Sequence, residues 1–246
     1  MTGQDFPQTE RVEKGVSTKA MFAACLNPLF LLMVFCMLLT ASTELGPNQW
    51  IPSLLTNAGV PGILVLAWIN GLMAVGRQCA GTFVHRLSPV GMLVTSAVLS
   101  AIGLYAIGHS SGMTLFATAT VFALGVCFFW PTMLGYVSEN FPKTGALGLA
   151  IMGGAGMLTV SFVLPVMGRF YDSGIAARIP AGRTAVELAA TPAGGELGNL
   201  WIKIQADAGL ETIGRVALLP AVLSVVFLVL LLLRRHRRTP AGAAPV

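Results

Sequence analysis

Long apolar runs that are almost free of charge recur along the chain, and they constrain its fold more than any other feature. A run of roughly 20 such residues spans the hydrocarbon core of a bilayer, which is about 30 Å thick. Only 10% of the 246 residues are charged, whereas soluble domains carry about 25%. The sequence therefore predicts an all-α integral membrane protein, because a helix satisfies its own backbone hydrogen bonds in lipid.

Hydropathy predicts six transmembrane helices within residues 27–235. In chain order these spans cover 28–55, with a break near Pro47, and then 62–84, 90–108, 113–137, 146–170 and 213–233. Residues 1–26 are predicted to be a cytoplasmic lead-in, and residues 236–246 a cytoplasmic tail. The polar segment over about 172–212 is predicted to be an external loop, with an interfacial helix in its second half.

The basic residues predict the orientation of these spans. They precede the first span and follow the second, fourth and sixth, ending in the cluster "RRHRR" at 234–238, whereas the turns after spans one and three carry no Lys or Arg. The positive-inside rule then places both termini in the cytoplasm. We expect a multi-pass protein of the cell membrane, an inner membrane where a cell has two, and no nucleic-acid partner.

Two ionisable residues, Glu44 and Arg77, lie well inside the predicted spans. Each costs roughly 2.5–3.5 kcal/mol at a helix centre unless water or a partner receives it. Measured from the cytoplasmic ends of their helices, Glu44 lies roughly 24 Å deep and Arg77 roughly 10 Å deep. We therefore expect no direct salt bridge between them, and we expect Arg77 to bond to carbonyls at a helix end.

Glu44 and Asn48 are four residues apart, and with Gln49 and Trp50 they are interpreted as the wall of a cavity. A second polar stripe contains Asn70, Ala74, Arg77 and Gly81. Trp130 is interpreted either as a stacking surface for a ligand or as part of a membrane-interface belt. The alternative for all the polar residues is bonding between neighbouring helices, at about 0.6 kcal/mol each.

The order of features suggests a three-plus-three inverted repeat. Trp50 and Pro52 in the first span match Trp130 and Pro131 in the fourth, and interrupted helices in matching positions mark the binding site of many transporters. The run "GLAIMGGAGML" in the fifth span predicts close helix packing.

Patterns that support catalysis or metal binding are missing from the sequence. Four cysteines lack ligand spacing, two of the histidines lie at opposite predicted faces, and no paired carboxylates occur. The prediction is that the protein is not an enzyme and that it holds no cofactor and no metal.

Several segments resemble the major facilitator superfamily. "GRQCAGTFVHRLSP", 76–89, is similar to the degenerate copy of its signature loop, with His85 where the better-preserved copy has Asp. "VLPVMGRFYDSG", 163–174, is similar to the end of the eleventh helix, and "VSENFPKTGALGLAIMGGAG", 137–156, to the turn before it. "TELGPNQW", 43–50, looks somewhat like the equivalent helix in sugar and proton symporters of that superfamily.

This resemblance covers about 25–235 and implies helices seven to twelve, the carboxyl-terminal half of a twelve-helix transporter. It implies secondary active transport of a small solute, such as a sugar, and a cytoplasmic gate at Arg77, Gly81, His85 and Arg86. Such a half supplies half a cavity, so the expected partners are the lipid bilayer, the solute and a second six-helix half, either a separate chain or a second copy.

Two hypotheses follow for the function. In the first, Glu44, Asn48, Gln49, Trp50, Asn70 and Trp130 line the solute path, and Glu44 exchanges a proton because burial disfavours its charged form. In the second, the chain is a non-transporting membrane module, either a remnant of a split gene or a partner-binding subunit.

Overall fold

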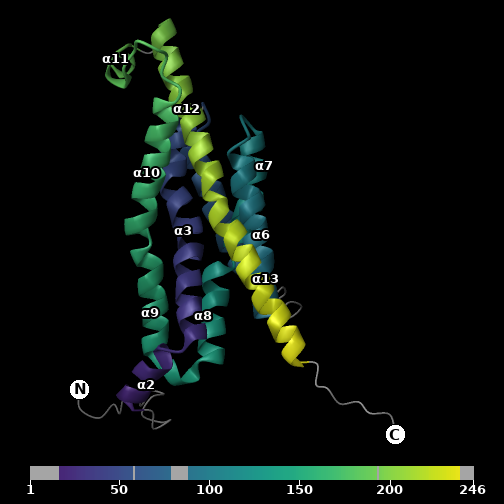
Figure 1. Cartoon of the computed structure of the whole chain (residues 1–246). Helices are drawn as coiled ribbons and strands as arrows, with labels where there is room; N and C mark the ends of the chain where they lie inside the picture. Colours follow the sequence, from purple (N-terminus) through teal and green to yellow (C-terminus); the bar gives the residue numbers. More distant parts are fainter. Residues whose placement is uncertain (1–16, 58, 79–87, 193, 239–246) are drawn as a thin grey trace, which may run out of the picture.

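The computed structural model describes residues 17–57, 59–78, 88–192 and 194–238, and in these ranges every regular element is a helix (Figure 1). Five helical segments are long and apolar enough to cross a membrane, and a shorter apolar helix, α4 (Gly62–Gln78), makes a sixth candidate. The described chain is therefore all-α and suits a multi-pass membrane protein.

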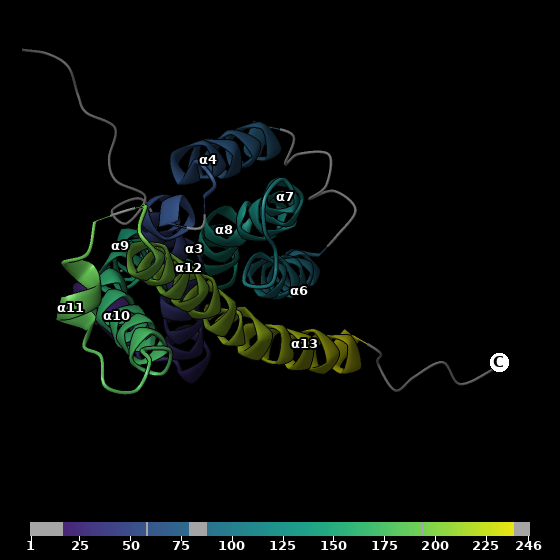
Figure 2. The ribbon, with the colours of Figure 1, turned by 90° about the horizontal axis from the view of Figure 1, so that it is seen from above.

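Helix α3 (Pro28–Asn57) is the centre of the bundle. It packs against α4, α8 (Phe129–Asn140), α9 (Gly145–Leu158), α10 (Val160–Ala176) and α12 (Glu196–Val216), as the view along the bundle shows (Figure 2). The predicted break near Pro47 is wrong, because the helix continues through both Pro47 and Pro52. Each proline removes only one backbone donor, and the surrounding helices hold the adjacent turns in place.

Helices α6 (Pro89–Ile107) and α7 (Thr114–Val126) pack at very short range. Ser88 caps α6 by accepting a hydrogen bond from the Gly91 amide, and Pro89 follows at the first helical position. A Cβ at Gly103 would lie 2.5 Å from the Phe122 backbone, and one at Gly125 would lie 2.4 Å from the Ser100 amide nitrogen. Glycine at both positions lets the two backbones approach, as small residues do in membrane bundles.

Three of the long helical segments are interrupted. α7 gives way to α8 at Cys127 and Phe128, α9 to α10 at Thr159, and α12 to α13 (Leu218–Arg238) at Ala217. At the second break the Thr159 hydroxyl donates to the Leu38 carbonyl at 2.9 Å and lies 2.5 Å from the Ser42 hydroxyl. The interruption between α9 and α10 is thereby bonded to the central helix.

The segment predicted as a loop over 172–212 is largely helical. α10 extends to Ala176, α11 (Ala185–Ala189) begins with a capping box between Thr184 and Glu187, and α12 starts at Glu196. The predicted helix in its second half is confirmed. It runs along the bundle and straight on toward α13, rather than across the end of the helices (Figure 1), because its small and apolar positions pack on α3, α6 and α10.

Helix α2 (Thr18–Cys25) lies within the predicted lead-in and packs against α9 and the 3-10 turn η1 (Pro142–Thr144). α2 and the end of α13 lie at the same end of the bundle (Figure 1), as an even number of spans requires. The side of the membrane on which they lie stays a prediction.

The run "GLAIMGGAGML" is predicted to pack closely against neighbouring helices, and it does so only in part. A Cβ at Gly156 would lie 2.5 Å from the Trp130 ring of α8, so this glycine packs closely on a neighbouring helix. At Gly148 the nearest atoms belong to Thr144 at the start of α9 itself, and Phe30 of α3 lies at 3.4 Å, an ordinary contact. At Gly153 and Gly154 no described atom comes within 4 Å of an added Cβ.

We predict opposite effects for two alanine substitutions. Alanine gains roughly 1 kcal/mol of helix propensity over glycine at either position. Gly103→Ala nevertheless lowers thermal stability in detergent, because its Cβ collides with the Phe122 backbone, whereas Gly154→Ala leaves stability equal or higher. Tryptophan fluorescence during heating measures both changes. Equal stability of the two variants would contradict the close contact between α6 and α7.

Candidate functional site: a buried ion pair on the central helix

Glu44 is the buried carboxylate of the central helix, with 6% of its surface exposed. Its backbone lies in the middle of α3, where Thr40, Ser42 and Thr43 are also buried. The hydroxyls of Thr40, Ser42 and Thr43 donate to the carbonyls of Met37, Leu38 and Leu39 in the preceding turn. Because these hydroxyls are occupied within α3, the carboxylate needs a partner from another helix.

Arg77, in the last turn of α4, is that partner. Its Nη2 lies 3.3 Å from Glu44 Oε1, and the Arg77 side chain is 40% exposed while that of Glu44 is 8% exposed. Our expectation that the two residues lie at different depths and form no salt bridge is therefore wrong.

The error arises because the depths of Glu44 and Arg77 are counted from the predicted cytoplasmic ends of their helices and not from the turn that joins the helices. α3 and α4 form a hairpin, and its connecting turn fixes which residues face each other. Counted from that turn, Glu44 lies 13 residues before Asn57 and Arg77 lies 15 residues after Gly62, which is roughly 20 Å and 22 Å along the two helices. The two side chains are thus at nearly the same level.

Arg77 also bonds to a helix end, as expected. Its Nε donates to the carbonyl of Cys127, 3.1 Å away, at the point where α7 stops. In an unbroken helix this carbonyl would accept from the amide of residue 131, but that residue is Pro131 and has no N–H. The proline therefore frees an acceptor, and the guanidinium takes it.

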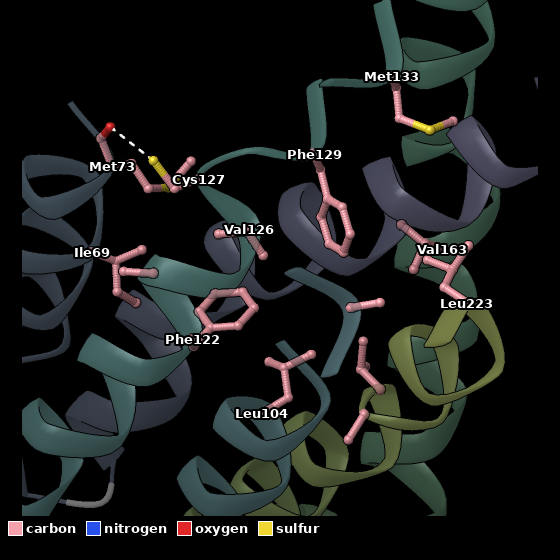
Figure 3. Close-up of a cluster of buried hydrophobic side chains, with 14 of the residues drawn as sticks. Ile69, Met73, Leu104, Phe122, Val126, Cys127, Phe129, Met133, Val163 and Leu223 are labelled. Atoms are coloured by element: carbon pink, nitrogen blue, oxygen red, sulfur yellow. Dashed lines mark hydrogen bonds between the residues drawn. The ribbon is translucent and has the colours of Figure 1, made fainter. Parts of the chain in front are cut away.

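Cys127 adds a second link between the same two helices. Its Sγ lies 3.3 Å from the Met73 carbonyl of α4, at the edge of the buried apolar cluster (Figure 3). Ile69, Phe122 and Phe129 belong to that cluster and are fully buried. The ion pair thus joins α3, α4 and the end of α7 beside a buried apolar core.

Two acceptors at this centre lack a partner among the described residues. Glu44 Oε2 and Asn48 Oδ1 are both buried and accept no hydrogen bond there. Since α3 is continuous, the two residues lie one turn apart on one face, as the sequence predicts. A proton on the carboxyl, a water molecule or a donor group of a solute would satisfy both acceptors.

Trp50 lies on the other face of α3, away from this centre. Two residues correspond to about 200° around a helix, so Asn48 and Trp50 point to opposite sides. The Trp50 ring meets Tyr171 of α10 edge-on, with ring centroids 5.8 Å apart. The predicted cavity wall is therefore divided between two faces.

The remaining predicted path residues are dispersed. Gln49 and Asn70 are exposed, and Trp130 is half-buried against Gly156 of α9. The structure brings together Glu44 and Arg77, with Asn48 one turn beyond Glu44 on α3, and no contact joins Gln49, Trp50, Asn70 or Trp130 to them among the described residues. The predicted gate residues Gly81, His85 and Arg86 lie outside the described residues.

The Cys127 carbonyl is the participant that sequence reasoning missed. The sequence signal for it is Pro131, four residues after Cys127. Because a proline has no N–H, the carbonyl four residues before it is left without its helical donor. Within the described ranges, no three His, Cys, Asp or Glu side chains converge as metal ligands would.

Comparisons with family models, with curated proteins and with solved structures find no match to this chain. The residues and their geometry therefore carry the functional argument.

We predict that the two halves of the ion pair contribute unequally to stability. Arg77→Met leaves Glu44 buried without a cation, which destabilises by up to about 3–5 kcal/mol. Glu44→Gln leaves Arg77 partly exposed and still bonded to Cys127, at a loss of about 1 kcal/mol. Denaturant unfolding in micelles measures both losses, and the double variant is more stable than Arg77→Met alone. A larger loss for Glu44→Gln would refute this reading of the pair.

Proposed function

We propose that the chain is the carboxyl-terminal half of an alternating-access secondary transporter, which moves a small solute such as a sugar and couples this movement to protons. The observation that carries the proposal is the buried Glu44 carboxylate, which has one oxygen on Arg77 and the other without a described partner beside Asn48. Intramembrane carboxylates commonly mark proton and substrate pathways.

Proton binding at Glu44 would weaken its attraction to Arg77. The pair is long, at 3.3 Å between Nη2 and Oε1, and 40% of the Arg77 side chain is exposed. Release of the pair would remove one polar contact between α3 and α4, which otherwise stay packed together, while Arg77 keeps its bond to the end of α7. A protonation step would thereby change how three helices are held together, which is what coupling requires.

The break between α7 and α8 supports a solute site near this centre. Discontinuous helices in membrane transporters present backbone groups to their substrates and ions. Here the end of α7 lies at Arg77, so one broken helix and one buried carboxylate meet at one level. The three-plus-three inverted repeat, with α3 and the α7–α8 segment in equivalent positions, is part of this proposal.

The proposal includes a second six-helix half as partner, because the resemblance to the major facilitator superfamily assigns to this chain one side of a shared cavity. That half is either a separate chain or a second copy of this one. We also propose that this chain carries the cytoplasmic gate, at Arg77, Gly81, His85 and Arg86, and that both of its termini are cytoplasmic.

We predict that Glu44→Gln abolishes coupled uptake. In proteoliposomes with an inward proton gradient, the wild-type chain, alone or with its second half, accumulates radiolabelled glucose or xylose above protein-free vesicles. Glu44→Gln reduces accumulation to the vesicle background but retains exchange of labelled for unlabelled sugar. Glu139→Gln, which removes an exposed carboxylate at the end of α8, leaves both unchanged.

Accumulation by Glu44→Gln at the wild-type level would refute the proton role. Absence of glucose and xylose movement by folded protein that has its partner would refute sugar transport.

A second candidate function is a membrane module that transports nothing and binds a partner. It is favoured by the two bonds of Arg77, to Glu44 and to the Cys127 carbonyl, which hold three helices together as a structural clamp does. In that case Glu44→Gln alters stability alone, and no solute moves.

A further inference from the structure

Two neighbouring cavities lie between α6, α10, α12 and the start of α13, away from the ion pair. One has a volume of about 460 Å³ and charged walls, and the other has a volume of about 780 Å³ and mostly apolar walls. They share Tyr105, Gly214 and Arg215, so they form one groove with a polar end and an apolar end.

The polar end contains two arginines held by one carboxylate. Glu211 accepts from Arg178 at 2.7 Å and from Arg215 at 2.6 Å. Arg178 also donates to the Gly174 carbonyl, whereas Arg215 donates through Nη2 alone to groups in the described chain. The Arg215 side chain is 45% exposed and lies 5.4 Å from the centre of the Phe170 ring. Its other N–H groups are therefore available to an anion.

Asp207 provides a negative charge at the same end. It is exposed, lines the charged cavity one helical turn before Glu211, and bonds to no other residue in the described part of the chain. The polar end thus offers an open arginine and an open carboxylate that flank Glu211 along α12 and line the same cavity, a pattern that complements a headgroup with both signs of charge.

The apolar end runs along the helices toward the middle of the bundle. Ala101 lies six residues from the end of α6, and Ala221 lies six residues beyond Arg215, which is roughly 9 Å along each helix. Ile102 and Leu218 on its walls are 54% and 68% exposed. A groove that is apolar at membrane depth and charged at the helix ends has the shape of a lipid, with chains below and headgroup above.

We propose that this groove binds a membrane phospholipid whose headgroup carries a phosphate and a primary ammonium group. The phosphate accepts hydrogen bonds from Arg215, and the ammonium donates to Asp207. The upper part of an acyl chain lies between Ala101, Phe170, Leu218 and Ala221. A purely anionic headgroup leaves Asp207 without a cation, and a quaternary ammonium has no N–H to donate to it.

The test is native mass spectrometry of the full chain, purified with equal amounts of dioleoyl phosphatidylethanolamine, phosphatidylglycerol and phosphatidylcholine. The ethanolamine lipid is retained about fivefold more than either of the others, as one favourable charge contact implies. Arg215→Gln lowers its retention about fivefold, and Arg215→Lys restores part of it. Asp207→Asn abolishes the preference for ethanolamine over glycerol headgroups.

Controls separate this site from general charge effects and from misfolding. Arg169→Gln and Asp172→Asn remove exposed charges on α10 that line neither cavity, and both retain the lipid as the wild type does. Ala221→Trp fills the apolar end and lowers retention without changing a charge. Each variant is first shown to unfold at the wild-type temperature.

Equal retention of the three lipids by the wild type would overturn the proposal, as would equal losses in the control variants. Displacement of the lipid by water-soluble glycerophosphoethanolamine would show instead a site for a soluble ligand.

Discussion

A carboxylate that lies in the interior of a helical bundle must be compensated, and the contact between Glu44 and Arg77 is the interaction on which the arrangement of α3, α4 and α7 depends. Charges attract strongly where water is scarce, and an isolated one is strongly disfavoured. Arg77 serves both Glu44 and the Cys127 carbonyl. One side chain therefore fixes the hairpin of α3 and α4 against the broken end of α7.

The prolines show how the surroundings decide the effect of a lost donor. Pro47 and Pro52 lie within α3, which other helices enclose, and the helix passes through them unbroken. Pro131 follows a change from α7 to α8, and there the freed carbonyl bonds to a guanidinium instead. The same backbone chemistry thus gives a continuous core helix at one place and a polar junction at another.

The bundle carries polar groups at two separate levels. The ion pair lies next to the buried apolar cluster, while the charged cluster of Arg178, Asp207, Glu211 and Arg215 lines a cavity between α6, α12 and the end of α10. In the first, the Glu44 carboxylate is almost fully buried while Arg77 is partly exposed; in the second, all four charged side chains are partly exposed and an apolar cavity adjoins them. The proposed change of protonation concerns the inner group, and the proposed recognition of a lipid headgroup concerns the outer group.

The sequence by itself determined the class of fold and most of the helices. Apolar runs of this length suit helices that cross a membrane, and their positions predicted α6 and the α7–α8 segment closely. The i, i+4 spacing of Glu44 and Asn48 placed them on one face, because α3 is regular. The many charges within 172–212 predict an external loop with a helix only in its second half, because the segment carries too few apolar positions to reveal that α12 packs along the bundle.

Only the tertiary structure decided which residues meet. The register of α3 against α4 is set by the turn that joins them. Hydropathy locates helix ends only to within a few residues, which is an error of several ångströms in the depth of Glu44 and of Arg77. Sequence therefore identified Glu44 and Arg77 but separated them, and it grouped Trp50 with Asn48 although they face opposite ways. Which neighbour fills each face depends on packing, and a linear pattern does not contain that information.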